Sequence, residues 1–242
     1  MKKIICGLFI SGVFIFSNCS DKDQITTGTL LMEMIDRDRL AEFPDPEYSS
    51  KQFSSYDRKS VSPDQPGWFA NADRSQFVRT EINNRRREFV LFDAEGPGAI
   101  VRFWITVAMY EGNGTLRIYI DNDPKPELEG EVLKMMSGGG ILEGPLAASV
   151  SEVTEYIKRG HNLYFPIPYN KHCKITYESA GVDEQPGAIS GEAFYYNINY
   201  RTYKKNVSIA SFSQKDLASY AEEVKLVHNS IIDYNSASPK NV

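Results

Sequence analysis

The sequence predicts an all-β protein, a jelly-roll β-sandwich with a short N-terminal helix and a C-terminal connector helix. Three β-rich runs between residues 88 and 121 are separated by turns that contain Gly and Pro. The first two runs are apolar on both faces, as in strands that lie within a two-layer stack. In the third run Leu116, Ile118 and Ile120 alternate with Arg, Tyr and Asp. This alternation predicts a strand with one buried face and one solvated face.

Length and composition favour a single domain with a sizeable core. The chain has 242 residues, of which 41 % are hydrophobic, and this fits one large sandwich. Its net charge of -5 is too small to indicate a polyanionic partner, so nucleic-acid binding is disfavoured. Cys173 is the only cysteine outside the N-terminal leader, so the body cannot form an internal disulfide. We therefore expect packing to stabilise the fold.

The N-terminus has the form of a secretory signal peptide over residues 1–18. Two lysines precede the apolar run Ile4–Phe16, which is too short to span a membrane. Cys19 follows and resembles the cysteine of a bacterial lipobox, which implies cleavage before it and lipidation. A plain signal peptide with an incidental cysteine is the alternative. We assign residues 19–29 to a tether and expect an outer-membrane or cell-surface lipoprotein, held at the membrane through its lipid anchor only.

Local patterns place the sandwich at residues 30–212. An apolar periodicity near 3.6 predicts a short amphipathic helix within Ile25–Phe43, with Thr29 near its start and Pro44 after its end. The residues from Tyr48 to Asp73 lack periodicity and are predicted to form a long loop. Further strand signals lie at Gln76–Ile82, Glu88–Asp93, Ile100–Val107, Thr115–Asp121, Lys174–Glu178 and Phe194–Tyr203. The two prolines of Asn162–Pro168 confine that run to an edge strand or to the rim of the sandwich.

Residues 213–242 are predicted to form the C-terminal helix and a polar tail. Ser213 and Asp216 have capping-box spacing, and an apolar stripe runs from Leu217 to Ile231. A helix that follows a complete sheet pattern and leads into a polar tail is typical of a connector. We expect it to lead to a second domain that this sequence does not contain.

The long loop carries the composition of a carbohydrate site. Ser, Pro, Asp and Gly dominate it, while Phe53, Tyr56, Trp68 and Phe69 are interspersed. Aromatic rings stack on the C–H faces of sugars, and polar side chains pair with sugar hydroxyls. The alternative is that Trp68 and Phe69 plug the end of the sandwich, and composition alone leaves both interpretations open.

The sequence contains no metal motif, so we expect neither a metal site nor a cofactor. His161, His172 and His228 do not lie at ligand spacing to another ligand. His172 and Cys173 are adjacent, but neighbours on a strand point to opposite faces. No nucleophile elbow is present. Paired carboxylates for glycoside hydrolysis are defined by their separation, which the sequence does not measure.

Several segments of the sequence resemble glycoside hydrolase family 172 in their order and spacing, over about Leu30 to Phe212. The resemblance lies in patterns such as Ser-Ser-Tyr-Asp-Arg and Gly-Pro-Gly-x-Ile-x-Arg-x-Trp. The matching segments are Phe53–Arg58, Gly67–Asp73, Glu95–Trp104, Leu116–Asp121, Tyr164–Tyr169 and Tyr195–Tyr200.

This resemblance implies the first of two tandem jelly rolls. The family assembles as trimers and hexamers, and it cleaves α-fructofuranosidic or α-arabinofuranosidic bonds with a retaining pair of glutamates. Those glutamates lie in the second half near a Gly-Thr-Glu-Asp-Tyr-Phe motif, which this sequence lacks. We therefore expect a truncated or split form without catalytic residues. The alternative is a stand-alone, non-catalytic carbohydrate-binding or assembly module.

By the same analogy, part of the long loop contacts a furanose-containing glycan. Asp57 and Arg58 form a structural ion pair in the alternative interpretation. A second copy of the chain, or a complementary jelly-roll chain, is the expected protein partner. The implied substrate-binding residues are Ser55, Asp57, Arg58, Trp68, Asn71 and Asp73.

Overall fold

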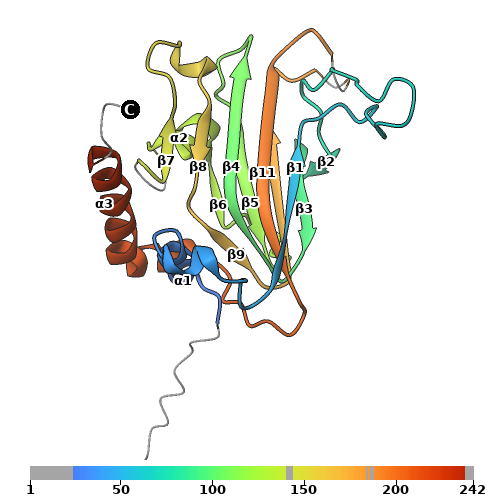
Figure 1. Ribbon diagram of the computed structural model, residues 1–242. Helices are drawn as coiled ribbons and strands as arrows, with labels where there is room; N and C mark the ends of the chain where they lie inside the picture. Colours follow the sequence, from blue (N-terminus) through green and yellow to red (C-terminus); the bar gives the residue numbers. More distant parts are fainter. Residues whose placement is uncertain (1–23, 140–143, 184, 186–187, 238–242) are drawn as a thin grey trace, which may run out of the picture.

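The computed structural model describes residues 24–139, 144–183, 185 and 188–237, and these form a β-sandwich (Figure 1). A six-stranded sheet has the order β1-β11-β4-β8-β7, with β9 also paired to β4, and a five-stranded sheet has the order β2-β3-β10-β5-β6. The predicted signal peptide, Cys19 and the end of the polar tail lie outside the described residues. The strands are β1 (Tyr48–Ser54), β2 (Arg79–Asn83), β3 (Arg86–Glu95), β4 (Gly98–Ala108), β5 (Thr115–Ile120), β6 (Leu128–Glu131), β7 (Ala147–Ser149), β8 (His161–Leu163), β9 (Ile167–Tyr169), β10 (His172–Glu178) and β11 (Ala193–Tyr203).

The connectivity is that of a jelly roll, which confirms the predicted fold class. Strands from the start and the end of the domain alternate within each sheet, as β1-β11-β4-β8 and β3-β10-β5-β6 show. All pairs within the two sheets are antiparallel. The fold therefore depends on pairings between residues far apart in the sequence.

Aromatic side chains fill much of the space between the sheets. The Phe92 ring lies 4.9 Å, between ring centroids, from both Phe53 and Tyr200. Near the other end, the rings of Tyr177 and Phe194 stack at 4.3 Å. Offset and edge-to-face contacts of this kind add to the energy of apolar burial and restrict how the two sheets can shift.

The outer face of β5 differs from the prediction of a solvated face. Arg117 is only 4 % exposed and Tyr119 only 3 % exposed. Strand β10 pairs with both β3 and β5, so Thr176 of β10 lies between Glu88 of β3 and the two outward side chains of β5. Glu88 accepts hydrogen bonds from Thr176 at 2.7 Å and from Tyr119 at 3.0 Å. Polar contacts between neighbouring strands thus bury the outer face of β5, which the alternation of apolar and polar residues predicted to be solvent-exposed.

The N-terminal helix is shorter than predicted and begins earlier. Helix α1 covers only Thr27–Glu33, and a 3₁₀ turn η1 follows at Asp38–Ala41. Thr26, rather than Thr29, caps the helix, because its side chain accepts the Thr29 backbone N–H at 3.0 Å. The fold also takes in residues 25–29, which the sequence assigned to the tether, since Ile25 forms a parallel bridge with Ile209.

Two strand predictions need correction. Residues 48–54 form β1 rather than loop, paired with β11 from Tyr48↔Tyr203 to Ser54↔Asn197. This strand lies at the sheet edge and is mostly exposed, so backbone pairing holds it without a hydrophobic pattern. The run at 162–168 is split into β8 and β9, and β8 lies between β4 and β7 rather than at an edge.

The C-terminal helical segment packs against the sandwich. It consists of a 3₁₀ helix η3 (Gln214–Tyr220) followed by α3 (Ala221–Ala237). Val227 is fully buried, and the predicted apolar stripe contacts the core. A Cβ atom added to Gly28 of α1 would come within 3.3 Å of the Tyr220 ring, so the two helical regions pack closely. The other helical elements are α2 (Val132–Ser137), which contacts β7 and β8, and the turn η2 (Tyr156–Lys158), which contacts β4.

Candidate functional site

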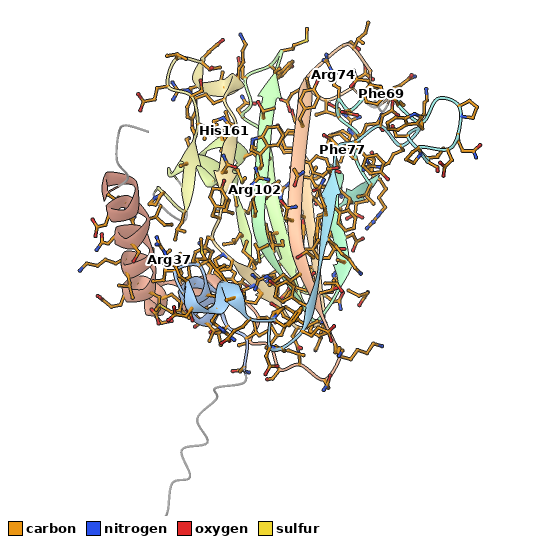
Figure 2. The ribbon with its side chains drawn as sticks, viewed as in Figure 1. Arg37, Phe69, Arg74, Phe77, Arg102 and His161 are labelled. Atoms are coloured by element: carbon orange, nitrogen blue, oxygen red, sulfur yellow. The ribbon has the colours of Figure 1, made fainter. Side chains whose placement is uncertain are left out.

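The segment between β1 and β2 projects from one side of the sandwich and carries exposed aromatic rings. Figure 1 shows this segment at the upper right, and Figure 2 shows Phe69 on it, away from the sheets. Trp68 is 46 % exposed and Phe69 is 74 % exposed, and their rings meet edge to face at 5.5 Å. These rings do not plug the end of the sandwich, so that interpretation is wrong.

A buried carboxylate fixes the shape of this projecting segment, which we call the aromatic loop (residues 55–73). Asp57 is 3 % exposed, and its two carboxylate oxygens accept the backbone N–H groups of Lys59 and Ala72, each at 3.0 Å. The Asp57 N–H in turn donates to the Asp73 carboxylate at 2.9 Å. The hydrogen bonds from Lys59 and Ala72 hold the pKa of Asp57 below its usual value. Both ends of the loop are therefore joined through one side chain.

Hydroxyl groups close the loop at two further points. The Ser60 hydroxyl accepts the Ala70 N–H and donates to the Ala70 carbonyl oxygen, both at 3.2 Å. The Ser55 hydroxyl accepts the backbone N–H of Tyr196 in β11 at 3.2 Å. The loop is thus fastened across its own width and to the six-stranded sheet, which gives its tip a defined position.

Arg58 does not form an ion pair with Asp57 in this structure. Its guanidinium donates to the carbonyl oxygens of Tyr56 at 2.5 Å and Ser54 at 2.9 Å, and it lies 4.0 Å above the centre of the Tyr56 ring. The alternative of a structural Asp57–Arg58 pair is therefore wrong. Arg58 instead supports the exit from β1, and it holds the half-exposed Tyr56 ring by a cation–π contact.

The six predicted contact residues lie in this one loop but differ in how they meet solvent. Ser55 and Asp57 are buried, Arg58 and Asp73 are partly buried, and the remaining two, Trp68 and Asn71, are exposed. Sugar contact stays a prediction for all six. The exposed ring of Phe69 was not in that set, although its position next to Trp68 was a signal for it. The structure thus divides the set into residues that hold the loop and residues that a ligand can reach.

A second polar feature was not predicted. A hollow of about 430 Å³ on the outer face of the five-stranded sheet is lined by residues of β2, β5 and β10 and by the turn after β5. Two of its side chains already have partners: Lys174 pairs with Glu81, and His172 is hydrogen-bonded to Asp93 at 2.6 Å. Cys173 is buried in the core while His172 faces this hollow, which confirms that the two side chains point to opposite faces.

A carboxyl group suited to donate a proton needs a raised pKa and access to substrate. Among the residues described, Glu192 has a carboxyl pKa raised by burial, but its side chain is fully enclosed. It accepts hydrogen bonds from Tyr177 at 2.6 Å and from Ser179 at 3.2 Å. It does not line the polar hollow on the five-stranded sheet. Within the residues that the structure describes, no three His, Cys, Asp or Glu side chains are grouped so that they could hold a metal ion.

The two interleaved sheets define the protein as a β-sandwich of the jelly-roll class. A family model described as the GH172 first beta-sandwich domain matches residues 46–220, from just before β1 to the end of η3, and the chain belongs to this family. The match includes the whole aromatic loop. A search of curated proteins found no match.

Proposed function

We propose that this protein is a bacterial surface lipoprotein whose GH172 domain binds a furanose-containing glycan and does not cleave it alone. The observation that carries the proposal is the exposed Trp68–Phe69 pair in a loop held by Asp57. Aromatic rings on a fixed loop lose little conformational entropy on binding, and exposed rings gain contact area. The exposed Asn71 amide, two residues after Phe69, offers both a donor and an acceptor to hydroxyl groups.

The carboxyl groups at the aromatic loop, at the polar hollow and in the core that have defined partners are not free to act in hydrolysis. Retaining hydrolysis needs an acid and a nucleophile about 5–5.5 Å apart at a sugar-sized cleft. Glu192 is buried, and Asp57 is occupied by backbone amides. Near the polar hollow, Glu81 is engaged by Lys174 and Asp93 by Arg79. On this proposal, cleavage of α-fructofuranosides or α-arabinofuranosides requires carboxylates from a second jelly-roll domain or chain.

The proposed anchor is a lipid on Cys19, outside the described residues. No helix in the described ranges is long and apolar enough to cross a membrane. The lipobox-like cysteine after a signal peptide is therefore the feature that supports membrane attachment. A second copy or a complementary jelly-roll chain remains the proposed protein partner, and light scattering of the purified chain measures that association.

Binding can be tested with α-arabinofuranosyl oligosaccharides and an α-fructofuranosyl disaccharide, using calorimetry. We expect Trp68→Ala and Phe69→Ala each to weaken binding by about two- to twelvefold, because an aromatic contact contributes roughly 0.5–1.5 kcal/mol. Val61→Ala is the matched control, since Val61 lies in the same loop and is 73 % exposed but has no ring.

Two results would contradict the proposal. Equal affinity for xylo-oligosaccharides would remove the preference for furanoses. Release of free arabinose or fructose by the isolated chain, lost on substitution of a single Asp or Glu, would show a complete active site in this domain.

A further inference from the structure

Two highly exposed apolar side chains project from the segment that joins α1 to β1. Leu40 is 84 % exposed and Phe43 is 98 % exposed. Both line a hollow of about 460 Å³ that is also lined by Gln24 and Ile25, the first residues the structure describes. Such exposure of large apolar groups at one place indicates a surface that meets another apolar phase.

We propose that this surface, which we call the basal surface (Leu40, Phe43 and the hollow beside Gln24), rests in the headgroup region of a lipid bilayer. The inference rests on the proposed lipid anchor at Cys19. It adds an orientation and a set of membrane contacts to that anchor.

The length of the tether carries the argument. The Ile25 N–H donates to the Ser208 carbonyl at 3.0 Å, and the Ile25 carbonyl accepts the Ala210 N–H at 2.9 Å, so the fold begins at this residue. Only Ser20–Asp23 lie between Cys19 and Gln24. Five residue steps span at most about 18 Å even when fully extended. A lipidated Cys19 therefore keeps the residues around Gln24, including Leu40 and Phe43, next to the bilayer.

The charges of the segment between α1 and β1 indicate that membrane contact would be driven by insertion of apolar side chains. Residues 36–47 contain five acidic residues and two arginines. This acidic excess opposes attraction to anionic lipids, so the contact must come from the leucine and phenylalanine side chains. We therefore expect the surface to bind neutral phosphatidylcholine and to bind less well when anionic lipid is added.

The orientation also suits the aromatic loop. Figure 1 shows α1 at the lower end of the sandwich and the β1–β2 segment at the upper right, and the labels of Arg37 and Phe69 in Figure 2 lie correspondingly far apart. A bilayer at the basal surface would leave Trp68 and Phe69 directed toward the surrounding solution, where a glycan is accessible.

The test uses the full lipidated chain in phosphatidylcholine vesicles with a nitrobenzoxadiazole dye attached after Phe43→Cys substitution. Val153→Cys is the matched control, since Val153 is 99 % exposed and lies between β7 and β8, at the upper end in Figure 1. The native Cys173 is buried, so it does not take up the dye. We expect lipid-borne doxyl groups to quench the dye at position 43 severalfold more than at position 153, and less so when anionic lipid is included.

The outcomes separate this inference from the proposed function. A lipidated Cys19, shown by the mass of the N-terminal peptide, together with equal quenching at both positions overturns the basal surface alone. An unmodified Cys19 overturns the lipoprotein proposal and this inference with it. If the Leu40→Glu/Phe43→Glu variant instead converts an oligomer to a monomer in light scattering, the surface is a protein interface and the inference is wrong.

Discussion

The pKa values of two buried glutamates, Glu88 and Glu192, are shifted in opposite directions. Burial alone would raise the pKa of Glu88, but hydrogen bonds from Thr176, Tyr119 and Arg86 outweigh it and lower the pKa. Burial also raises the pKa of Glu192, and there the donated hydrogen bonds do not reverse it. The difference is physical: cations surround Glu88, whereas hydroxyl groups surround Glu192.

This contrast predicts opposite pH dependences. Glu88 contributes stability above its unfolded pKa near 4.5, and this is lost as the pH falls through the lower folded pKa. Glu192 contributes stability below about 4.5, and this is lost as the pH rises through its higher folded pKa. In thermal melts from pH 3 to pH 8, Glu88→Gln should flatten the acid side of the Tm profile. Glu192→Gln should flatten the decline toward pH 8.

The two variants also differ in absolute stability at pH 7. Glu88→Gln removes the carboxylate charge that faces Arg86 at 3.0 Å, whereas Arg117 keeps its ion pairs with Glu178 and Glu129. Losing a hydrogen-bonded charge of this kind costs about 1.5–3 kcal/mol. Glu192→Gln removes no partner cation and should cost less. Matching Tm profiles for the two variants across the whole pH range would contradict this assignment of the charges.

At the scale of elements, the aromatic loop is predicted to lose its shape without losing the sandwich. Asp57→Ala removes the acceptor that joins Lys59 to Ala72, so residues 58–72 should become open to protease. Limited proteolysis with mass spectrometry should show faster cleavage in this range, with little change in far-UV circular dichroism. Asp64→Ala is the control, because Asp64 is exposed and lies in the same loop. Equal cleavage rates for the two variants would show that the hydrogen bonds of Asp57 do not hold the loop in place.

The elements that could be predicted from the sequence are those whose own residues determine them. The buried strands β3, β4, β5 and β10 have strong apolar patterns, so their positions were predicted within a few residues. Strand β1 was missed because its stability comes from pairing with β11, nearly 150 residues later, and not from its own side chains. Helix α1 was predicted too long because Met34 and Leu40 continue the apolar period while remaining exposed.

The same reasoning applies to the candidate site. Composition identified the aromatic loop, and the exposure of Trp68 and Phe69 supports its availability to a ligand. The role of Asp57 in holding the loop could not be predicted from the sequence, because the N–H groups of Lys59 and Ala72 reach its carboxylate only in the folded loop. Carboxylates next to aromatic residues indicate a polar loop, but only three-dimensional contacts separate an acceptor for backbone amides from an acceptor for sugar hydroxyls.

For the whole molecule, the core cysteine offers a direct test of cooperativity. Cys173 has no exposed surface, and its strand β10 joins β3 to β5 at the centre of the five-stranded sheet. Burial raises the pKa of its thiol, so the reactive thiolate is disfavoured as well as inaccessible. The long-range pairing of the jelly roll means that this site should not open unless both sheets separate.

We therefore predict that Cys173 reacts with Ellman's reagent only when the domain unfolds globally. In the mature chain with Cys19→Ser, the labelling rate in water should be about a thousandfold or more below that of the urea-unfolded chain, as expected for an unfolding free energy above roughly 4 kcal/mol. With increasing urea, the labelling should rise together with the loss of circular dichroism. Rapid labelling before any spectral change would mean that the sheets separate locally. In that case this jelly roll would need a partner to complete its stability.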